Sequence, residues 1–513
     1  MKNLSNLSIH LVIAIAFLYI FLQCKSSEQE SETTSINPIV TENQHTGTTD
    51  WLLENVQTDT CRITDPYEET FFCRSKPIEG YTSHTSIKAG ETLEVFVSTD
   101  PPSPFTVDIY RMGYYGGKGG RKMASLGSFE GKTQPTPEDE EKNLRECQWE
   151  KSFDLEIPQD WMSGVYLGKM TAEESGLQSY IVFVVKDDRQ ADFIFQCSDL
   201  TWQSYNRWPE WRSSYDWYYE NGGHNPWHTN VGAEVSFDRP YTFYMNWLPS
   251  GLNPLTNGSG EFLLWEFPLA FWMESLGYDV TFISNLDTHT DPDGLLRAKG
   301  FLSVGHDEYW TQQMFDNVTA ARDKGLNLLF LGGNSLSGEI YLKPSSEGDA
   351  NRIFGRVERF PDPEKLMGSA SYGVGLASWR CEAPEHWVFE GTGMQKGDTI
   401  PDLVGWEYHG YPVGDIPGIQ VLATGSMYEV DEDNNYAATY YETPHGNFVF
   451  NAATCWWNML LSTPPGFPVP VNPRGLFTDR PIDFSQNDPR VQRITQNLLD
   501  RITQGKEENQ ESF

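Results

Sequence analysis

The chain has 513 residues, of which 38% are hydrophobic and 14% aromatic, and its formal net charge is −35 at neutral pH. This length is sufficient for two or three domains with a large core. The negative charge argues against a nucleic-acid partner, because phosphate binding requires a positive surface, and it is typical of a highly soluble protein.

The first residues have the pattern of an export signal. Lys2 supplies a positive start, and Leu11 to Leu22 form an apolar stretch too short to span a bilayer. Cys24 follows this stretch and precedes a polar segment, as in bacterial lipoproteins, although Gln23 stands where such signals have a small residue. We predict that residues 1–24 export the chain to the periplasm or cell surface, with a lipid anchor to the membrane through Cys24. A plain secretory signal is the alternative.

Two different segments follow the signal. Residues 25–50 have few apolar side chains and are predicted to be a disordered tether. Residues 51–189 contain short alternating apolar runs separated by turn residues, which predicts a β-sandwich domain. The clearest runs are Leu93–Val97, Phe105–Ile109 and Tyr180–Val184.

Cysteine spacing gives a further expectation. Besides Cys24 there are six cysteines, an even number that permits disulfides outside the cytoplasm. Cys61 and Cys73 are close in sequence and are the favoured pair. The C-x-x-C spacing of a zinc knuckle does not occur, so a structural zinc site of that kind is not expected.

Residues 190–505 alternate strands with helices, which predicts an α/β domain with a doubly wound, mostly parallel sheet. Residues 345–440 interrupt this rhythm with Gly, Pro and Trp and are predicted to be an irregular insertion. The expected strands are Ala191–Phe195, Val280–Ile283, Phe301–Val304, Leu326–Leu331 and Phe448–Ala452. The expected helices are Glu261–Leu276, Pro292–Lys299, Thr311–Lys324 and Val491–Ile502.

Polar side chains follow two neighbouring strands of this predicted sheet. The segment Gly305–Trp310 contains His306 and Glu308 directly after one strand, and Asn334 follows the next. In open α/β sheets, ligands bind outside the carboxyl ends of the strands. We therefore expect these three side chains to converge on one active site.

A dense aromatic region lies between Trp202 and Trp247, just after another predicted strand. Three interpretations stay open: packing of loops, since rings bury much area; a platform on which sugars stack; or tyrosines that serve as metal ligands.

Several short motifs occur together in a particular order: Tyr205-Asn206, Ser214-Tyr215-Asp216, Arg239-Pro240-Tyr241, Gly305–Trp310 and Leu331–Asn334. In this order and approximate spacing they resemble the large subunit of N,N-dimethylformamidase and its relatives. The resemblance covers roughly Phe193 to Thr503, and the run Tyr110–Gly117 resembles the β-sandwich domain of such relatives.

This resemblance implies a mononuclear ferric iron held by two tyrosines and one glutamate. Glu308 would be the carboxylate ligand and Tyr205 the first tyrosine. Tyr215 is favoured as the second tyrosine because Ser-x-Tyr-Asp resembles the family's motif, and Tyr241 is its rival. His306 would lie beside these ligands.

The same resemblance implies hydrolysis of a C–N bond in a small amide. Ferric iron accepts phenolate and carboxylate oxygens and polarises a carbonyl or activates water. Glu407 would take the proton from water, and Asn334 or His306 would stabilise the oxyanion. The corresponding motif of the formamidase reads His-Pro-Glu, so Asp307 stands at the position of its proline. The sequence leaves open whether a small partner subunit or a homo-oligomer exists.

Three alternatives to this hydrolase remain. A surface-anchored carbohydrate-binding protein would use the Trp- and Tyr-rich loops without chemistry. A serine hydrolase would use Ser335, but Ser337 replaces the second glycine of a nucleophile elbow. A zinc site would use some of His224, His228, His289, His409 and His445, whose spacings match no familiar zinc motif.

Overall fold

The computed structural model describes residues 37–62, 70–138, 140–209, 233–242, 257–410, 416–427, 435–462, 471–472, 482–484 and 486–504. Contacts divide the chain into Met1–Pro38 and Ile39–Phe513, and the fold below is that of the second unit. The predicted export signal lies outside the described residues. Among the helices that are described, none combines the length and apolar character needed to cross a membrane.

The described structure includes part of the segment that the sequence assigned to the tether. Helix α2 spans Pro38–Glu42, and the Ile39 side chain is fully buried. The Glu42 carboxylate pairs with Arg121 at 2.8 Å and accepts a hydrogen bond from the Tyr115 hydroxyl at 2.7 Å. The expectation of a tether through residue 50 was therefore wrong from Ile39 onward, because these contacts compensate for the polar local composition.

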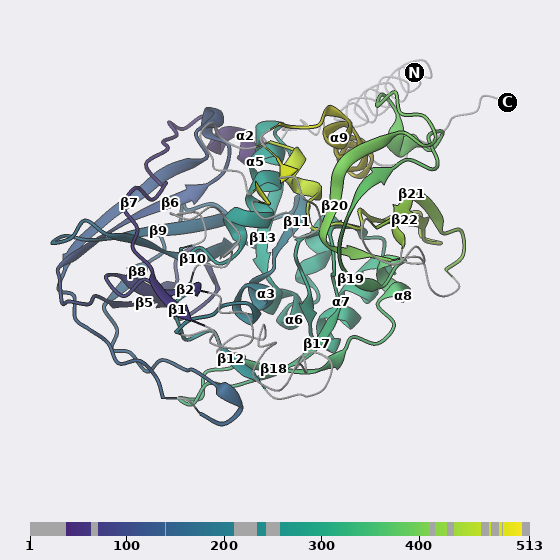
Figure 1. Cartoon of the computed structure of the whole chain (residues 1–513). Helices are drawn as coiled ribbons and strands as arrows, with labels where there is room; N and C mark the ends of the chain where they lie inside the picture. Colours follow the sequence, from purple (N-terminus) through teal and green to yellow (C-terminus); the bar gives the residue numbers. More distant parts are fainter. Residues whose placement is uncertain are drawn as a thin grey trace, which may run out of the picture. The chain divides into compact units, whose positions relative to one another are not determined.

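The N-terminal half is rich in β-structure, as predicted, and is shown at the purple and blue end of Figure 1. Apolar side chains of two sheets share one core, in which Val95, Ile109, Phe153 and Phe183 are buried. One sheet has the order β3 (Glu79–Thr82), β5 (Thr92–Ser98), β8 (Phe153–Glu156). The other has the order β4 (Ser86–Lys88), β10 (Gln178–Lys186), β9 (Gly164–Ala172), β6 (Phe105–Met112), β7 (Gly120–Phe129).

The cysteines of the described region do not form disulfides with one another. Cys147, Cys197, Cys381 and Cys455 are free and buried. Strands β1 (Asp59–Arg62) and β2 (Thr70–Arg74) form an antiparallel pair. The side chains of Cys61 and Cys73 lie outside the described part, so their pairing stays a prediction.

The C-terminal half is built on a seven-stranded mixed sheet (Figure 1). Its first five strands run parallel and its last two pair antiparallel. The chain is therefore a mixed α/β protein, and the doubly wound topology stays a prediction. The order is β13 (Val280–Ser284), β11 (Ala191–Cys197), β14 (Ala298–Gly305), β16 (Asn327–Gly332), β23 (Phe448–Asn451), β22 (Asn435–Glu442), β21 (Gln420–Ser426).

Helices cover both faces of this sheet. Alternate side chains of its strands therefore enter two different cores. Phe195 and Leu302 belong to the core that contains α5 (Phe267–Ser275) and α9 (Pro489–Gln504). Their neighbours in sequence belong to the core that contains α7 (Gln312–Arg322). The described part of this half also contains the short helices α3 (Asp199–Ser204), α6 (Asn285–Thr290) and α8 (Glu364–Met367).

Local sequence explains how two of these helices begin. The Thr311 hydroxyl accepts the Met314 N–H at 3.1 Å and caps α7, as predicted. The helix predicted over Glu261–Leu276 is divided into a π-helical turn, η5 (Phe262–Glu266), and α5. Pro268 lies in the first turn of α5, where its missing N–H needs no partner.

Residues 345–440 contain regular strands, so the prediction of an irregular insertion was wrong. Strand β18 (Ile353–Arg359) pairs with β17 (Gly338–Lys343), and β19 (Ser371–Arg380) pairs with β20 (Thr399–His409). The pairing of β19 with β20 shifts register twice, and β19 contains Gly373 and Gly375. These interruptions obscure the apolar alternation by which a strand is recognised. Two short strands, β12 (Glu234–Ser236) and β15 (Tyr309–Trp310), extend the sheet of β17 and β18.

A buried ion pair joins the two halves of this unit. The Arg111 guanidinium on β6 donates to the Glu274 carboxylate on α5 at 2.8 and 3.3 Å, and both side chains are 0% exposed. Glu274 also accepts the Asn43 side-chain amide at 3.0 Å and the Tyr114 N–H at 3.2 Å. Losing one partner of such a pair leaves an uncompensated buried charge.

We expect Glu274→Ala to lower the free energy of unfolding by about 3–5 kcal/mol, because Arg111 would then be buried without its counter-charge. Denaturant unfolding followed by circular dichroism measures this. Asp108→Ala is the control, since the pair of Asp108 with Lys122 is partly exposed and should be worth less than about 1 kcal/mol. Equal effects of the two substitutions on the free energy of unfolding would contradict the role of Arg111 and Glu274 as a buried ion pair.

Candidate metal and catalytic site

His306 and Glu308 are positioned by the end of β14. Gly305 has a φ of +68°, and a Cβ at this position would lie 2.4 Å from the Cβ of Trp265. Only glycine fits this turn, after which the chain leaves the sheet edge. The Glu308 N–H then donates to the Thr201 hydroxyl at 2.9 Å, which ties this segment to α3.

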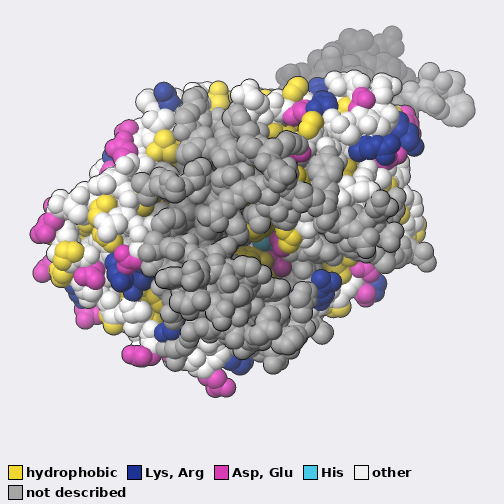
Figure 2. Space-filling model, in the orientation of Figure 1, with side chains coloured by type: hydrophobic (Ala, Val, Ile, Leu, Met, Phe, Trp, Pro, Cys, Tyr) yellow, Lys and Arg dark blue, Asp and Glu magenta, His cyan; other side chains and the backbone are white. Residues whose placement is uncertain are grey.

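Three ionisable side chains meet at this edge of the sheet. The Nε2 atom of His306 lies 3.2 Å from the Glu308 Oε2 atom and 2.5 Å from the Glu407 Oε2 atom. The candidate ligand atoms of all three residues lie within 4.8 Å of one another. Figure 2 shows a histidine and acidic side chains near the centre of the visible face. The fold thus brings Glu407 of β20 to the segment that follows β14, although the two are far apart in the sequence.

Tyr205 joins this cluster from the end of α3. Its hydroxyl donates to the Glu308 Oε2 atom at 2.5 Å, and its ring centroid lies 5.2 Å from that of His306. The Tyr309 hydroxyl lies 3.5 Å from the Tyr205 hydroxyl. The phenol of Tyr205 and the carboxylate of Glu308 are therefore adjacent, and their roles as metal ligands stay a prediction.

Glu407 is held in place by a close approach of two backbones. A Cβ on Gly333 would lie 2.1 Å from the Glu407 carbonyl oxygen, so glycine is required there. The Cys455 N–H donates to the same carbonyl at 3.3 Å. Asn334 follows Gly333 and has a φ of +54°. The close approach of Gly333 brings the chain at Asn334 next to the chain at Glu407, and the role of Asn334 stays a prediction.

Glu261 is a member of the site that sequence reasoning missed. Its Oε2 atom lies 3.7 Å from the Nδ1 atom of His306 and accepts the Trp265 indole N–H at 2.8 Å. Glu261 precedes a helical segment and carries no motif, so only the fold reveals its contact with the imidazole. His306 thus lies between Glu261 on one side and Glu308 and Glu407 on the other.

The electrostatics of the cluster follow from burial and crowding. Burial opposes the charged form of His306, but the Glu407, Glu261 and Glu308 carboxylates raise the pKa of its imidazole well above the ordinary value. Burial also raises the pKa of Glu407, helped by the charge of Glu308 and opposed by His306. Burial raises the pKa of the Glu261 carboxyl group as well.

Two adjacent atoms of the cluster lack a hydrogen bond within the described part of the chain. The His306 Nε2 and Glu407 Oε2 atoms are buried, yet neither completes a hydrogen bond of acceptable geometry. Buried polar atoms without partners are rare in folded proteins. Together with the oxygen donors of Tyr205 and Glu308, they make a donor set that fits a cation.

Asp307 has a structural role between the two candidate residues. Its carboxylate is buried and accepts hydrogen bonds from Gln196 at 2.6 Å, Ser303 at 2.8 Å and Asn285 at 3.0 Å. Burial raises the pKa of Asp307, and these donors oppose that shift. The side chain therefore points into the scaffold and fixes the segment that carries His306 and Glu308.

The second tyrosine ligand is not settled. Tyr215 lies outside the described residues. The Tyr241 ring contacts that of Trp202, with 6.3 Å between their centroids. Burial raises the pKa of the Tyr241 phenol well above its ordinary value.

Ser335 and His409 do not form a nucleophile–base pair. The His409 Nε2 atom accepts the backbone N–H of Ser335 at 2.8 Å, and its Nδ1 atom faces the Asn451 side-chain oxygen at 2.6 Å. His409 therefore carries its proton on Nδ1 and holds the turn after β16. Burial lowers the pKa of His409 to about 4.

The other alternative sites receive little support from the described residues. His289 contacts the Thr311 hydroxyl at 2.8 Å, while His224 and His228 lie outside the described part. The exposed fractions of Trp202 and Trp208 are 4% and 0%, so neither ring is available to stack on a sugar. Most other rings of the aromatic region are also outside the described residues.

The protein thus has a mixed α/β fold in which an imidazole and two carboxyl groups, gathered at strand ends, could together hold a metal ion. The family described as N,N-dimethylformamidase beta subunit-like, C-terminal, matches residues 106–469, and the chain belongs to it. The match begins within β6 and includes His306, Glu308 and Glu407. No match was found among curated proteins.

We expect His409 to make unfolding depend on pH. Its folded pKa of about 4 lies below the unfolded value of about 6.5, so its stabilising effect is complete above pH ~6.5 and declines as the pH falls toward 4. The contribution of His409 to the free energy of unfolding should fall by roughly 3 kcal/mol over this range. Unfolding free energies at pH 7 and pH 4 should therefore differ less in His409→Gln than in the wild type.

His445→Gln, at an exposed position, is the matched control and should keep the wild-type profile. An unchanged profile in His409→Gln would show that this imidazole is not buried in its neutral form.

Proposed function

We propose that this protein is a metal-dependent hydrolase that cleaves the C–N bond of a small amide. The observation that carries the proposal is the buried cluster of His306, Glu308 and Glu407, with Tyr205 on Glu308, in a chain of the dimethylformamidase-like family. Members of one fold family often differ in substrate, so the proposed substrate is a small amide, of which dimethylformamide is one example.

Iron is the metal that this donor set favours. Tyr205 and Glu308 would hold it through oxygen atoms, with Tyr215 as the second phenolate, and ferric iron prefers such hard ligands. When bound, it would supply Lewis acidity, which polarises an amide carbonyl or lowers the pKa of water. The short contact between the Tyr205 and Glu308 oxygens supports this assignment, since both atoms face one position.

Glu407 is suited to accept the proton of the attacking water. Its pKa is raised by burial and by Glu308, which makes the carboxylate a stronger base than an exposed glutamate. The side chain remains 13% exposed, whereas that of His306 is fully buried. Glu407 is therefore the group of this pair that solvent reaches.

His306 is suited to donate a hydrogen bond to the reacting group. Its raised pKa favours the imidazolium, whose Nε2–H faces the same space as the Glu407 carboxylate. In amide hydrolysis, the water oxygen bonds the carbonyl carbon while a proton passes to Glu407. That proton then reaches the amide nitrogen as the C–N bond breaks, and the imidazolium and the Asn334 amide stabilise the negative oxygen.

Two glutamate substitutions separate metal binding from proton transfer. Glu308→Ala should lose both iron and activity, because it removes a ligand. Glu407→Gln should keep the iron and lower kcat for small amides about 10²- to 10⁴-fold, the usual range for a general base. Iron is measured by elemental analysis, and activity by amine release from formamide, acetamide and N,N-dimethylformamide.

Glu347→Gln, at an exposed loop position, is the control and should change neither quantity. Loss of iron in Glu407→Gln would mean that His306, Glu308 and Glu407 hold the metal directly. Retention of iron in Glu308→Ala, or no hydrolysis of any amide by the iron-loaded wild type, would contradict the proposal.

A further inference from the structure

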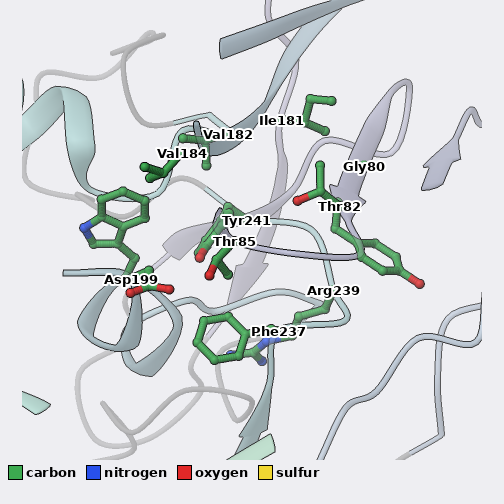
Figure 3. A pocket seen from close by; sticks show the side chains of 12 residues that line it. Gly80, Thr82, Thr85, Ile181, Val182, Val184, Asp199, Phe237, Arg239 and Tyr241 are labelled. Atoms are coloured by element: carbon green, nitrogen blue, oxygen red, sulfur yellow. The ribbon is translucent and has the colours of Figure 1, made fainter. Parts of the chain in front are cut away.

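A cavity lies between strands of the β-rich half and residues of the α/β half (Figure 3). Thr82 and Thr85 line it from one side, Val182 and Val184 from β10, and Asp199 from the start of α3. None of the cluster residues Tyr205, His306, Glu308 and Glu407 is among its lining residues, so this cavity is separate from the candidate catalytic site.

The Asp199 carboxylate is the most unusual group in the cavity. It is 1% exposed, and its Oδ1 atom accepts the Asn285 N–H at 2.7 Å. The Oδ2 atom is buried without a hydrogen bond of acceptable geometry from any described residue. Figure 3 shows the carboxylate directed toward Thr85 and Tyr241. Burial raises the pKa of Asp199 to about 7, while the hydrogen bond from the Asn285 N–H opposes that shift.

The remaining walls are mainly apolar and aromatic. Ile181, Val182 and Val184 supply aliphatic surface, and Trp202 and Tyr241 supply rings whose edges meet at 70°. The Trp202 indole N–H donates to Glu266 at 2.9 Å, so the ring contributes its faces and edges to the cavity rather than its donor. A carboxylate among rings and methyl groups recognises a small cation that carries an alkyl group.

The nearby arginine is already committed to other partners. The Arg239 guanidinium donates to the Gln203 side chain at 3.0 Å, to the Gln203 carbonyl at 2.9 Å and to the Trp208 carbonyl at 3.0 Å. It therefore serves to fix the chain on this side of the cavity. Among the lining residues, the Asp199 carboxylate is therefore the charged group that keeps an atom without a hydrogen bond.

We propose that this cavity binds a small alkylammonium cation, with its N–H groups on the Asp199 Oδ2 atom and its alkyl group against the β10 valines and the rings. A buried carboxylate gains its missing hydrogen bond and a counter-charge in this way. The apolar walls discriminate against hydrated inorganic cations, which would lose their water without replacement ligands.

Helix α3 connects this cavity to the candidate catalytic site. It begins at Asp199, its Thr201 hydroxyl accepts the Glu308 N–H, and Tyr205 at its end contacts the Glu308 carboxylate. Hydrolysis of an amide releases an amine that is protonated at neutral pH, so the ligand matches a product of that reaction. This last link rests on the proposed function, whereas binding of the cation does not.

Calorimetric titration of the full chain with methylammonium chloride tests the proposal without any need for activity. We expect saturable binding of one cation per chain. Methanol, a neutral molecule of the same heavy-atom count, and sodium chloride at equal ionic strength should show none. Asp199→Asn should weaken binding about tenfold or more, because it removes a buried charge while keeping the side-chain shape.

Asp188→Asn is the matched control, since Asp188 pairs with Lys88 at the surface and should leave the affinity unchanged. Val182→Phe, which fills the cavity from β10, should abolish binding with Asp199 intact. The wild-type comparison of methylammonium with methanol decides the question even if a variant fails to fold. Absence of saturation would mean that the cavity holds a water only, and equal binding of methanol or unchanged affinity in Asp199→Asn would overturn the proposal. Failure of the proposed amide hydrolysis would leave all these results unaffected.

Discussion

Three carboxyl groups crowd around one imidazole at the end of β14, and much of the surrounding structure serves to hold them there. Glu261, Glu308 and Glu407 contribute the carboxyl groups, and His306 contributes the imidazole. Like charges at this separation, away from water, repel strongly unless a carboxyl group takes up a proton or a cation lies among them. One imidazolium offsets only part of that charge, which is the physical reason to expect a metal ion at this position.

Scaffold and site differ in how completely their polar groups are satisfied. Asp307 and His409 are buried next to the cluster, and each has hydrogen-bond partners that fix its orientation. The Nε2 atom of His306 and the Oε2 atom of Glu407 lack such partners among the described residues. Satisfied neighbours thus hold unsatisfied groups in place, an arrangement that keeps those groups available for a ligand and a substrate.

The sequence predicted the parts of this structure that depend on local pattern. The Thr311 cap of α7 and the strands before His306 and Asn334 were recognisable from spacing and capping residues alone. Glu407 was identified only through family resemblance, because β20 lies in a region whose glycines and register shifts hide its strands. Glu261 could not be identified at all, since its contact with His306 depends on how η5 packs against the end of β14.

The second tyrosine illustrates a different limit. Tyr215 and Tyr241 both fit the family motif by order in the sequence, and spacing alone cannot rank them. In the described structure the Tyr241 ring contacts that of Trp202, and both rings line the cavity that contains Asp199. Tyr205, in contrast, is placed on Glu308 by its position at the end of α3. Long-range packing rather than local sequence therefore decides which phenol lies beside Glu308.

The most direct test of a tyrosine–carboxylate iron site is elemental analysis of the purified protein together with its visible absorption spectrum. Phenolate bound to ferric iron gives a charge-transfer colour that neither zinc nor a metal-free site produces. The account predicts one iron per chain and a coloured protein. A colourless protein that remains metal-free after incubation with ferric or ferrous iron would contradict it.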